Sequence, residues 1–399
     1  MKKSGCTQRF LWFGLVAGTI FIAGSCQRAK EQKLQSEVDQ IAKHWVPDHR
    51  IGICNVKLTQ GKNGAMVLSG ETNKRGAKDE LIKTLNNQCK VLIDSIILLP
   101  DTIKNEKYMG LVTLSVINLR KEPDHASELV SQARLGTPVL ILKEVNSWLL
   151  IQTPDKYISW TEGSSVKVMT AKEISDWKKA PRVIYLENTG WLYDTTTANS
   201  GVVGDLTGGS ILEKRGEVNG FACVVLPDGR RGFVDAKTIM DFDKWEKLFP
   251  SDEKNIERVA MRFMGLPYLW GGSSAKAVDC SGFVQSVYFM NGIILERDAS
   301  LQALHGSAVD ISDGYSRLKK GDLLFFGSKR NGVSRVTHVA LYLGNNDYIN
   351  SSGRVQINSL DPVQTNFSSK RVNSLLSARR ILGVEKDDGI VPVFMHPWY

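Results

Sequence analysis

Val-Asp-Cys-Ser-Gly-Phe, residues 278–283, is the stretch around which the rest of this chain can be organised. Apolar residues follow it at helical spacing, and Asp279 is a favourable N-cap, so the stretch predicts a helix that begins at Cys280. The positive end of a helix stabilises a thiolate and lowers the pKa of a thiol in its first turn. Backbone N–H groups at the same place can stabilise an oxyanion. The stretch therefore predicts a nucleophile at Cys280.

A nucleophilic thiol needs a base, and His338 is the best-placed histidine for that role. It lies in an alternating segment, Thr-His-Val-Ala-Leu-Tyr-Leu-Gly at 337–344, which predicts a strand with His338 on the face opposite Val339. Twelve residues later, Asn350 is the polar group expected to orient the imidazole. Each signal is weak alone, because a strand histidine usually packs or faces solvent and an Asn after a strand usually forms a turn. Their order along the chain makes them informative together.

In order and spacing, the segment 250–385 resembles the NlpC/P60 family of papain-like cell-wall peptidases. The resemblance implies an α+β papain-like catalytic domain with Cys280 as nucleophile, His338 as base and Asn350 as third polar residue. Many relatives have a histidine at the last position, so Asn350 departs from the family pattern. The matching motifs are Pro-Tyr-Leu-Trp-Gly-Gly (267–272), Asp-Cys-Ser-Gly-Phe (279–283), Arg-Asp-Ala-Ser (297–300), Gly-Asp-Leu-Leu-Phe-Phe (321–326) and His-Val-Ala-Leu-Tyr-Leu-Gly (338–344).

The same resemblance implies residues that bind substrate. Tyr268 matches a family tyrosine near the nucleophile, whose hydroxyl serves the oxyanion or the substrate. The layout of the whole chain is similar to γ-D-glutamyl-L-diamino acid endopeptidases. In those enzymes the positions of Asp279, Ser281 and Ser300 bind the free amino end of the substrate. The alternative for Asp279 is a role as N-cap alone.

Residues 108–240 contain an internal repeat. Glu-Val-Asn at 144–146 recurs 73 residues later, and other turn and aromatic positions recur at the same offset. Each copy reads as short strands between Gly, Pro or Asx turns, which predicts two small β-barrels that resemble bacterial SH3-like (SH3b) modules. The alternative is two barrels without a binding role. The first module walls the pocket in similar enzymes, and Trp160 and Glu162 are the residues expected to do so here.

The N-terminus resembles a lipoprotein signal. A basic start precedes an uncharged run at 10–24, which is too short for a membrane span and suits a signal peptide. Small residues then precede Cys26, as in a bacterial lipobox, and the polar stretch that begins at 30–33 suits a tether. We therefore expect an exported lipoprotein, anchored to the membrane through lipid on Cys26, in the periplasm or cell envelope. The alternative is plain secretion, with Cys26 incidental.

The remaining cysteines have less specific settings. Residues 26–105 read as a small α/β domain in the order strand, strand, helix, strand, which loosely resembles a BON-type domain. Cys54 and Cys89 share this domain and could pair, because export permits disulfides. Cys223 lies in an apolar run and is predicted to be a buried core thiol.

The predicted fold is thus multidomain. The net charge of +9 is modest for 399 residues and no compact basic block stands out, so nucleic acid is not expected as a partner. No Cys/His spacing typical of zinc appears, and no metal or organic cofactor is expected. We expect a monomer. The predicted parts are a signal peptide (1–25), a small α/β domain (26–105), a first SH3b domain (106–170), a linker helix with a second SH3b domain (171–244), an NlpC/P60 peptidase domain (245–385) and a C-terminal tail (386–399).

The predicted function is that of a cysteine endopeptidase. It would hydrolyse the bond between γ-D-Glu and the diamino acid in murein peptides with a free N-terminal L-Ala, in cell-wall turnover or recycling. One alternative is a CHAP-type amidase, which cuts between glycan and peptide. Another is an inactive adaptor that binds the wall through its SH3b pair.

Overall fold

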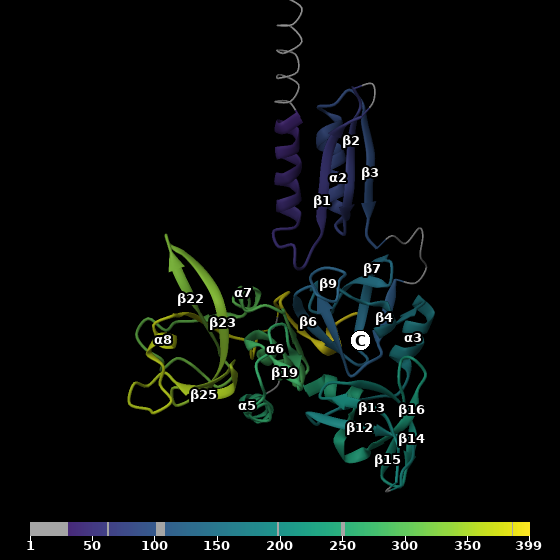
Figure 1. Cartoon of the computed structure of the whole chain (residues 1–399). Coiled ribbons are helices and arrows are strands. Elements are labelled where there is room, and N and C mark those ends of the chain that lie inside the picture. The colour runs from purple at the N-terminus through teal and green to yellow at the C-terminus, as the bar shows by residue number, and fades with distance from the viewer. Residues whose placement is uncertain (1–30, 62–63, 101–107, 198, 249–251, 385) are drawn as a thin grey trace, which may run out of the picture. The chain divides into compact units, whose positions relative to one another are not determined.

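The structure is a computed structural model, and it describes residues 31–61, 64–100, 108–197, 199–248, 252–384 and 386–399 (Figure 1). The chain divides into two compact units, Met1–Asp101 and Thr102–Tyr399. The predicted signal peptide and Cys26 lie outside the described residues. Within the described part, no helix is both long enough and apolar enough to cross a membrane.

The first unit is a three-stranded sheet with two helices. β1 pairs antiparallel with β2, and β2 pairs parallel with β3, so the helix between β2 and β3 serves as the crossover. This is the predicted order of strand, strand, helix and strand. The elements are β1 (Cys54–Gln60), β2 (Met66–Thr72), α2 (Arg75–Asn86) and β3 (Leu92–Leu98).

The expected tether is wrong from residue 31 onward, because residues 31–45 form a helix. Leu34 and Val38, four residues apart on one face of it, are buried in the same core as Leu68. Because Leu34 and Val38 are surrounded by polar residues in the sequence, this apolar stripe of the helix was not predicted. Cys54 and Cys89 pack against the same core, and no disulfide joins them to each other.

The second unit contains two seven-stranded sheets with the same topology. The first has the order β10-β4-β7-β8-β9-β5-β6, and the second has the corresponding order β17-β11-β14-β15-β16-β12-β13. Every strand of the second sheet begins 73 residues after its counterpart in the first. The first sheet comprises β4 (Met109–Val112), β5 (Val116–Arg120), β6 (Leu129–Arg134), β7 (Pro138–Val145), β8 (Trp148–Gln152), β9 (Ile158–Glu162) and β10 (Val166–Met169). The second sheet comprises β11 (Arg182–Tyr185), β12 (Thr189–Tyr193), β13 (Val202–Thr207), β14 (Ile211–Val218), β15 (Phe221–Val225), β16 (Arg231–Asp235) and β17 (Ile239–Asp241).

Two further predictions fall on these sheets. The helix that joins them, α3 (Ala171–Lys179), begins with a capping box in which Thr170 and Glu173 bond reciprocally. The prediction that Cys223 is a buried core thiol is wrong, because the thiol is only half-buried. β15 alternates, and Ala222 and Val224 occupy the core face in its place.

The rest of the second unit combines helix α6 with a six-stranded sheet of order β21-β26-β22-β23-β24-β25. Phe283 and Val287 of α6 share a core with Val339 and Leu341 of β23. The helices are α4 (Phe242–Trp245), α5 (Glu253–Met261), α6 (Cys280–Phe289), α7 (Ala299–Gln302) and α8 (Ser369–Val372). The strands are β18 (Ser273–Ser274), β19 (Ala277–Val278), β20 (Ile293–Leu295), β21 (Ser307–Val309), β22 (Leu323–Arg330), β23 (Val333–Gly344), β24 (Asp347–Ser352), β25 (Arg354–Ser359), β26 (Leu375–Arg380) and β27 (Ile390–Pro392).

Residues 386–399, set apart by sequence as a tail, are packed into this unit. β27 pairs antiparallel with β20. Tyr399 is buried and stacks near Phe242 and Phe289, with ring centroids 6.1 and 6.4 Å away. The end of the chain therefore contributes to the core between the sheets and α6.

Candidate active site

The predicted nucleophile stands at a helix start. α6 begins at Cys280, and the Asp279 side chain caps it by accepting a hydrogen bond from the Gly282 backbone N–H at 2.7 Å. The Cys280 sulfur also accepts hydrogen bonds from the backbone N–H groups of Ser281 and Val339. Val339 follows His338 directly on β23, so these contacts bring the thiol to the strand that carries the predicted base.

The expected lowering of the thiol pKa at the helix start is wrong for this structure. Burial raises the pKa of Cys280 to about 11, and the negative charge of Asp279 raises it further. The two backbone N–H groups and Arg297 act in the other direction without overcoming burial. The thiol is therefore protonated at neutral pH and needs a base to remove its proton.

His338 is held by a single, well-defined partner. Its Nε2 lies 3.0 Å from Oδ1 of Asn350, and the Asn350 Nδ2 donates to Oδ1 of Asn358 at 2.9 Å. Because the amide nitrogen is already used as a donor, its oxygen faces the imidazole and accepts from Nε2–H. This tautomer leaves the lone pair of His338 on Nδ1. Asn350 thus orients the base as predicted from sequence.

The imidazole is neutral as well as oriented. Burial lowers the pKa of His338 to about 3, and the positive charge of Arg371 lowers it further. The Phe326 ring packs against the imidazole with centroids 5.8 Å apart. The site therefore holds a neutral thiol and a neutral imidazole, which suits transfer of the proton during attack rather than before it.

The predicted substrate residues lie in three different settings. Burial raises the pKa of Tyr268 to about 12, with the Cys280 charge as the next cause, so a protonated phenol lies close to the thiol. Ser281 is buried in the first turn of α6. Ser300 is half-buried in the short helix α7.

Asp279 is fully engaged within the protein. Its two carboxylate oxygens accept five hydrogen bonds from described residues. Arg297, which is buried, donates two of them at 2.6 and 3.1 Å. A carboxylate offers about four lone-pair sites, so no acceptor position is left for a substrate ammonium. The structure favours the alternative role of Asp279 as N-cap and partner of Arg297. Sequence reasoning had quoted Arg297 within a motif without assigning it a role.

The first sheet contacts this region through β6. Ser131 Oγ accepts from Arg297 Nε at 3.0 Å, and Gln132 Oε1 accepts from the Ser273 backbone N–H at 3.2 Å. Arg134 Nη2 donates to the Ser273 carbonyl and to Ser286 Oγ, both at 2.6 Å. β6 therefore bonds to Arg297 and to the residues around the start of α6.

Trp160 and Glu162 lie on β9, and the sequence predicts that they wall the substrate pocket. Each has a contact within the first sheet or its turns. Lys143 Nζ lies 5.7 Å from the centroid of the Trp160 ring. Glu162 Oε1 lies 3.5 Å from His125 Nδ1 at the surface. The pocket-wall role of Trp160 and Glu162 therefore stays a prediction.

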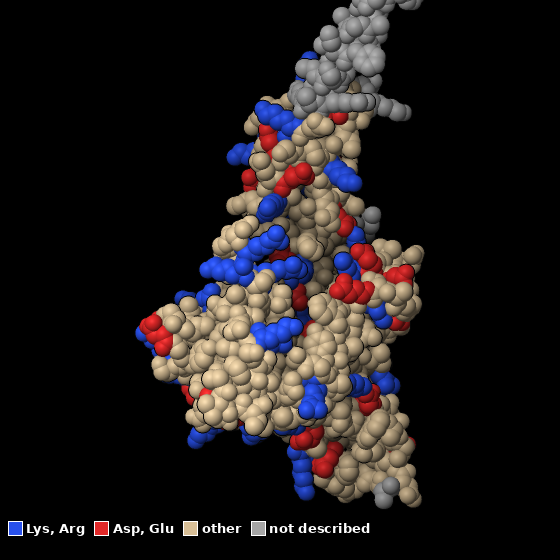
Figure 2. All heavy atoms as spheres, turned by 60° about the vertical axis from the view of Figure 1, so that its left-hand side comes forward, with Lys and Arg blue, Asp and Glu red and all other residues tan. Residues whose placement is uncertain are grey.

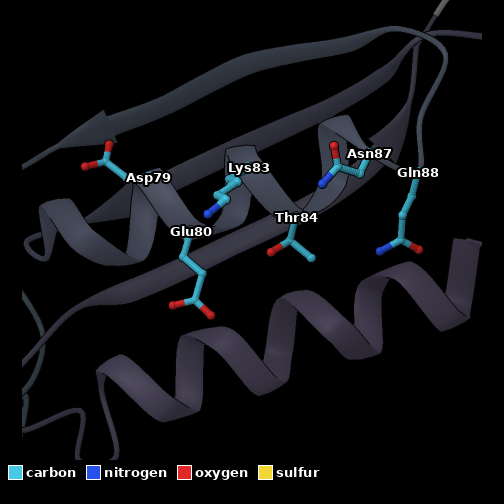
Figure 3. A pocket seen from close by; sticks show the side chains of 6 residues that line it. All are labelled: Asp79, Glu80, Lys83, Thr84, Asn87 and Gln88. Carbon is cyan, nitrogen blue, oxygen red and sulfur yellow. The ribbon is translucent and has the colours of Figure 1, made fainter.

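A separate hollow lies far from this chemistry in the sequence, in the described residues of the first unit. A hollow of about 640 Å³ in the first unit is lined by α2, and Figure 3 shows Glu80, Thr84 and Gln88 extending toward the neighbouring helix. No group of three or more His, Cys, Asp or Glu side chains within the described ranges is arranged to hold a metal ion. Figure 2 shows basic and acidic side chains separated by wide uncharged surface on the face that it draws.

A cysteine at a helix start is thus hydrogen-bonded to the strand whose histidine is oriented by an amide. Residues 265–376 match the NlpC/P60 family, and residues 115–167 match the bacterial SH3 domain. The chain belongs to the NlpC/P60 family.

Similar proteins agree with this placement. The chain is 31% identical to dipeptidyl-peptidase 6 of Lysinibacillus sphaericus over 265 residues, which cover 63% of this chain and 92% of the relative. It is 28% identical to gamma-D-glutamyl-L-lysine dipeptidyl-peptidase of Bacillus cereus over 248 residues, covering 60% and 72% of the two chains. A crystal structure of an NlpC/P60 family protein from Bacillus cereus shares the fold, with a TM-score of 0.59, 22% identity, and coverage of 69% and 99%.

Proposed function

We propose that this chain, a cell-wall peptidase by kinship, is a cysteine endopeptidase that cleaves the bond between γ-D-Glu and the diamino acid of murein peptides with a free N-terminal L-Ala. The observation that carries the proposal is the hydrogen bond between the Cys280 thiol and the backbone N–H of Val339, the residue next to His338, whose imidazole Asn350 orients at 3.0 Å. The names of the two relatives, both dipeptidyl-peptidases, support the choice of bond.

The chemistry follows from the two neutral groups. Nδ1 of His338 takes the thiol proton as Sγ of Cys280 attacks the γ-carbonyl carbon of D-Glu. The negative charge that develops on the carbonyl oxygen is stabilised by N–H groups at the start of α6 and by the Tyr268 hydroxyl, which stays protonated. The tetrahedral intermediate then breaks its C–N bond, and His338 gives the proton to the leaving amine.

Hydrolysis of the thioester completes the cycle. His338 removes a proton from water, whose oxygen attacks the thioester carbonyl, and the Cys280 thiolate leaves and is reprotonated. The products are L-Ala-D-Glu and the diamino acid fragment. Arg297 and Asp279 keep the start of α6 in place through their paired hydrogen bonds. Asn350 holds the tautomer of His338 that carries its proton on Nε2, which leaves the Nδ1 lone pair available to take a proton.

We also propose that the chain is exported and held at the membrane by lipid on Cys26. The support is the sequence of the first 26 residues, with a basic start, an uncharged run and small residues before the cysteine. Metabolic labelling with a fatty acid tests this proposal. Label is expected on the wild type and not on Cys26→Ala, and equal labelling of both would contradict it.

Product analysis tests the proposed reaction. The purified protein is incubated with L-Ala-γ-D-Glu-diamino acid, with its N-acetylated form and with intact sacculi, and new termini are identified by mass spectrometry. Release of the diamino acid from the free tripeptide is expected. Cys280→Ala should lower the rate at least about a thousandfold. Release of intact stem peptide from sacculi would instead indicate an amidase, and equal inactivity of wild type and Cys280→Ala would indicate an adaptor.

A further inference from the structure

A cationic side chain stands next to the predicted base without an acidic partner. Arg371 lies on the short helix α8 and is half-buried. Its Nη2 donates to Ser352 Oγ at 3.4 Å, and its guanidinium carbon lies 5.6 Å from the centroid of the Phe326 ring. Within the described ranges, no carboxylate forms an ion pair with it. A half-buried guanidinium normally finds an anion, so its surroundings suit an anionic ligand.

Arg371 is close to the imidazole. The Phe326 ring that it covers also packs against His338, with centroids 5.8 Å apart, and against Tyr348, at 5.7 Å. The charge of Arg371 acts on both groups, since it is among the causes that shift the pKa of His338 downward and that oppose the rise in the pKa of Tyr348. The guanidinium therefore belongs to the His338 side of the site.

A second observation concerns Tyr348, whose ring packs against the same Phe326 ring that Arg371 covers. The Tyr348 side chain is fully buried, yet its hydroxyl has no hydrogen-bond partner among the described residues. Leaving a buried hydroxyl without a partner costs about 1–3 kcal/mol, and native proteins rarely retain such groups without a reason. A ligand atom held by Arg371 would give this hydroxyl an acceptor.

The chemistry of the reaction says which part of the substrate lies there. His338 must protonate the leaving amine, so the leaving fragment occupies the His338 side of the thiol. That amine belongs to the α-carbon of the diamino acid, whose own carboxylate is attached to the same carbon. Of the charged groups that act on the thiol, Asp279 and Arg297 already neutralise each other. The unpaired positive charge thus faces the fragment that carries a carboxylate.

We propose that Arg371, with the hydroxyls of Tyr348 and Ser352, binds the α-carboxylate of the leaving diamino acid. This assignment rests on the proposed function and sharpens its substrate class. A free carboxylate exists only where the diamino acid is the C-terminal residue, because a further residue converts it into an amide. The chain is then selective for peptides that end at the diamino acid.

The test compares two peptides that differ only at this carboxylate. L-Ala-γ-D-Glu-diamino acid is assayed beside its α-carboxamide, with wild type, Arg371→Gln and Lys370→Gln, an exposed neighbour on the same helix. The wild type is expected to favour the free acid in kcat/KM by roughly 30-fold, the size of a charge-assisted hydrogen-bond pair. Arg371→Gln should remove most of this preference, mainly through KM, and Lys370→Gln should retain it.

The α-carboxamide peptide distinguishes binding of the substrate carboxylate by Arg371 from an indirect effect of the Arg371 charge on His338. If Arg371 acted only by its charge on His338, the variant would change both peptides alike. Tyr348→Phe adds a second readout, with a preference reduced roughly fivefold and no loss of thermal stability, because a hydroxyl without a protein partner is removed. Inactive Cys280→Ala should bind the free acid more tightly than the carboxamide in calorimetry.

The assay distinguishes failure of the carboxylate site from failure of the proposed function. Equal kcat/KM of the wild type on the two peptides would overturn the carboxylate site while leaving the reaction in place. An equal loss on both peptides in Arg371→Gln would overturn it as well. Inactivity of the wild type on both would overturn the proposed function and this site together.

Discussion

The two seven-stranded sheets share every strand and their order, but they contact the rest of the molecule differently. β6 of the first sheet carries Ser131, Gln132 and Arg134, which bond to Arg297 and to the segment that leads into α6. The corresponding residues of β13, 73 positions later, are Gly204, Asp205 and Thr207. Asp205 bonds to Ser115 of the first sheet and pairs with the exposed Lys276.

The turn between β8 and β9 differs in the same way from its counterpart between β15 and β16. Asp155 of the first sheet is half-buried and accepts from Gln285 Nε2 on α6 at 2.7 Å. Its counterpart Asp228 pairs at 2.7 Å with Arg230 in its own turn. The two sheets therefore have one scaffold, and a few side chains on one edge attach the first of them to the nucleophile helix. A shared fold does not imply a shared role.

The largest effect is expected when Arg134 is replaced by its counterpart, in Arg134→Thr. Burial lowers the pKa of Arg134 to about 10, and the guanidinium also lies 5.1 Å from the centroid of the Phe289 ring. Losing its contacts to Ser273 and Ser286 should lower the free energy of unfolding by about 3 kcal/mol. Thermal denaturation measures the loss. Arg215→Thr, at an exposed arginine of the second sheet, is the control, and an equal loss in both would contradict the distinction.

A smaller and more local effect is expected for Ser131→Gly. Arg297 Nε then lacks its acceptor. The ion pair of Arg297 with Asp279, the N-cap of α6, is therefore held less firmly. We expect a roughly tenfold lower kcat/KM, in line with the loss of one hydrogen bond to a charged group. The reverse exchange in the second sheet, Gly204→Ser, should leave kcat/KM unchanged. If both variants behaved alike, β6 would have no special part in the site.

The reactivity of the thiol gives the smallest expected change. Because the pKa of Cys280 is raised to about 11, its alkylation by iodoacetamide should be slow at pH 7 and should rise with pH toward that value. Ser131→Gly should speed alkylation at pH 8 a few-fold by loosening the start of the helix. Peptide mass mapping separates Cys280 from Cys223. A rate for Cys280 that is already maximal at pH 7 would contradict the neutral thiol.

The sequence predicted what depends on local pattern. Asp279 before an apolar helical run predicted the start of α6, and alternation around His338 predicted the face that Asn350 shares. The repeat predicted elements that the structure places at the same spacing. These features follow from periodicity and capping, which operate over a few residues.

Properties that depend on tertiary burial could not be predicted in this way. The thiol pKa moved opposite to the helix-start expectation, because packing against β23 outweighs the helix end. Arg297 is distant in sequence from Asp279, so its occupation of the carboxylate was not visible in the motif. Cys223 sits in an apolar run, yet it lies on the less buried face of β15.

Turnover in the presence of hydroxylamine tests the central claim most directly, because a thioester on Cys280 passes its acyl group to this nucleophile. With L-Ala-γ-D-Glu-diamino acid as substrate, we predict formation of the γ-hydroxamate of L-Ala-D-Glu by the wild type and its loss in Cys280→Ala. Cleavage that yields only the hydrolysed dipeptide, or a hydroxamate on another carbonyl, would contradict attack by Cys280 at the γ-D-Glu bond.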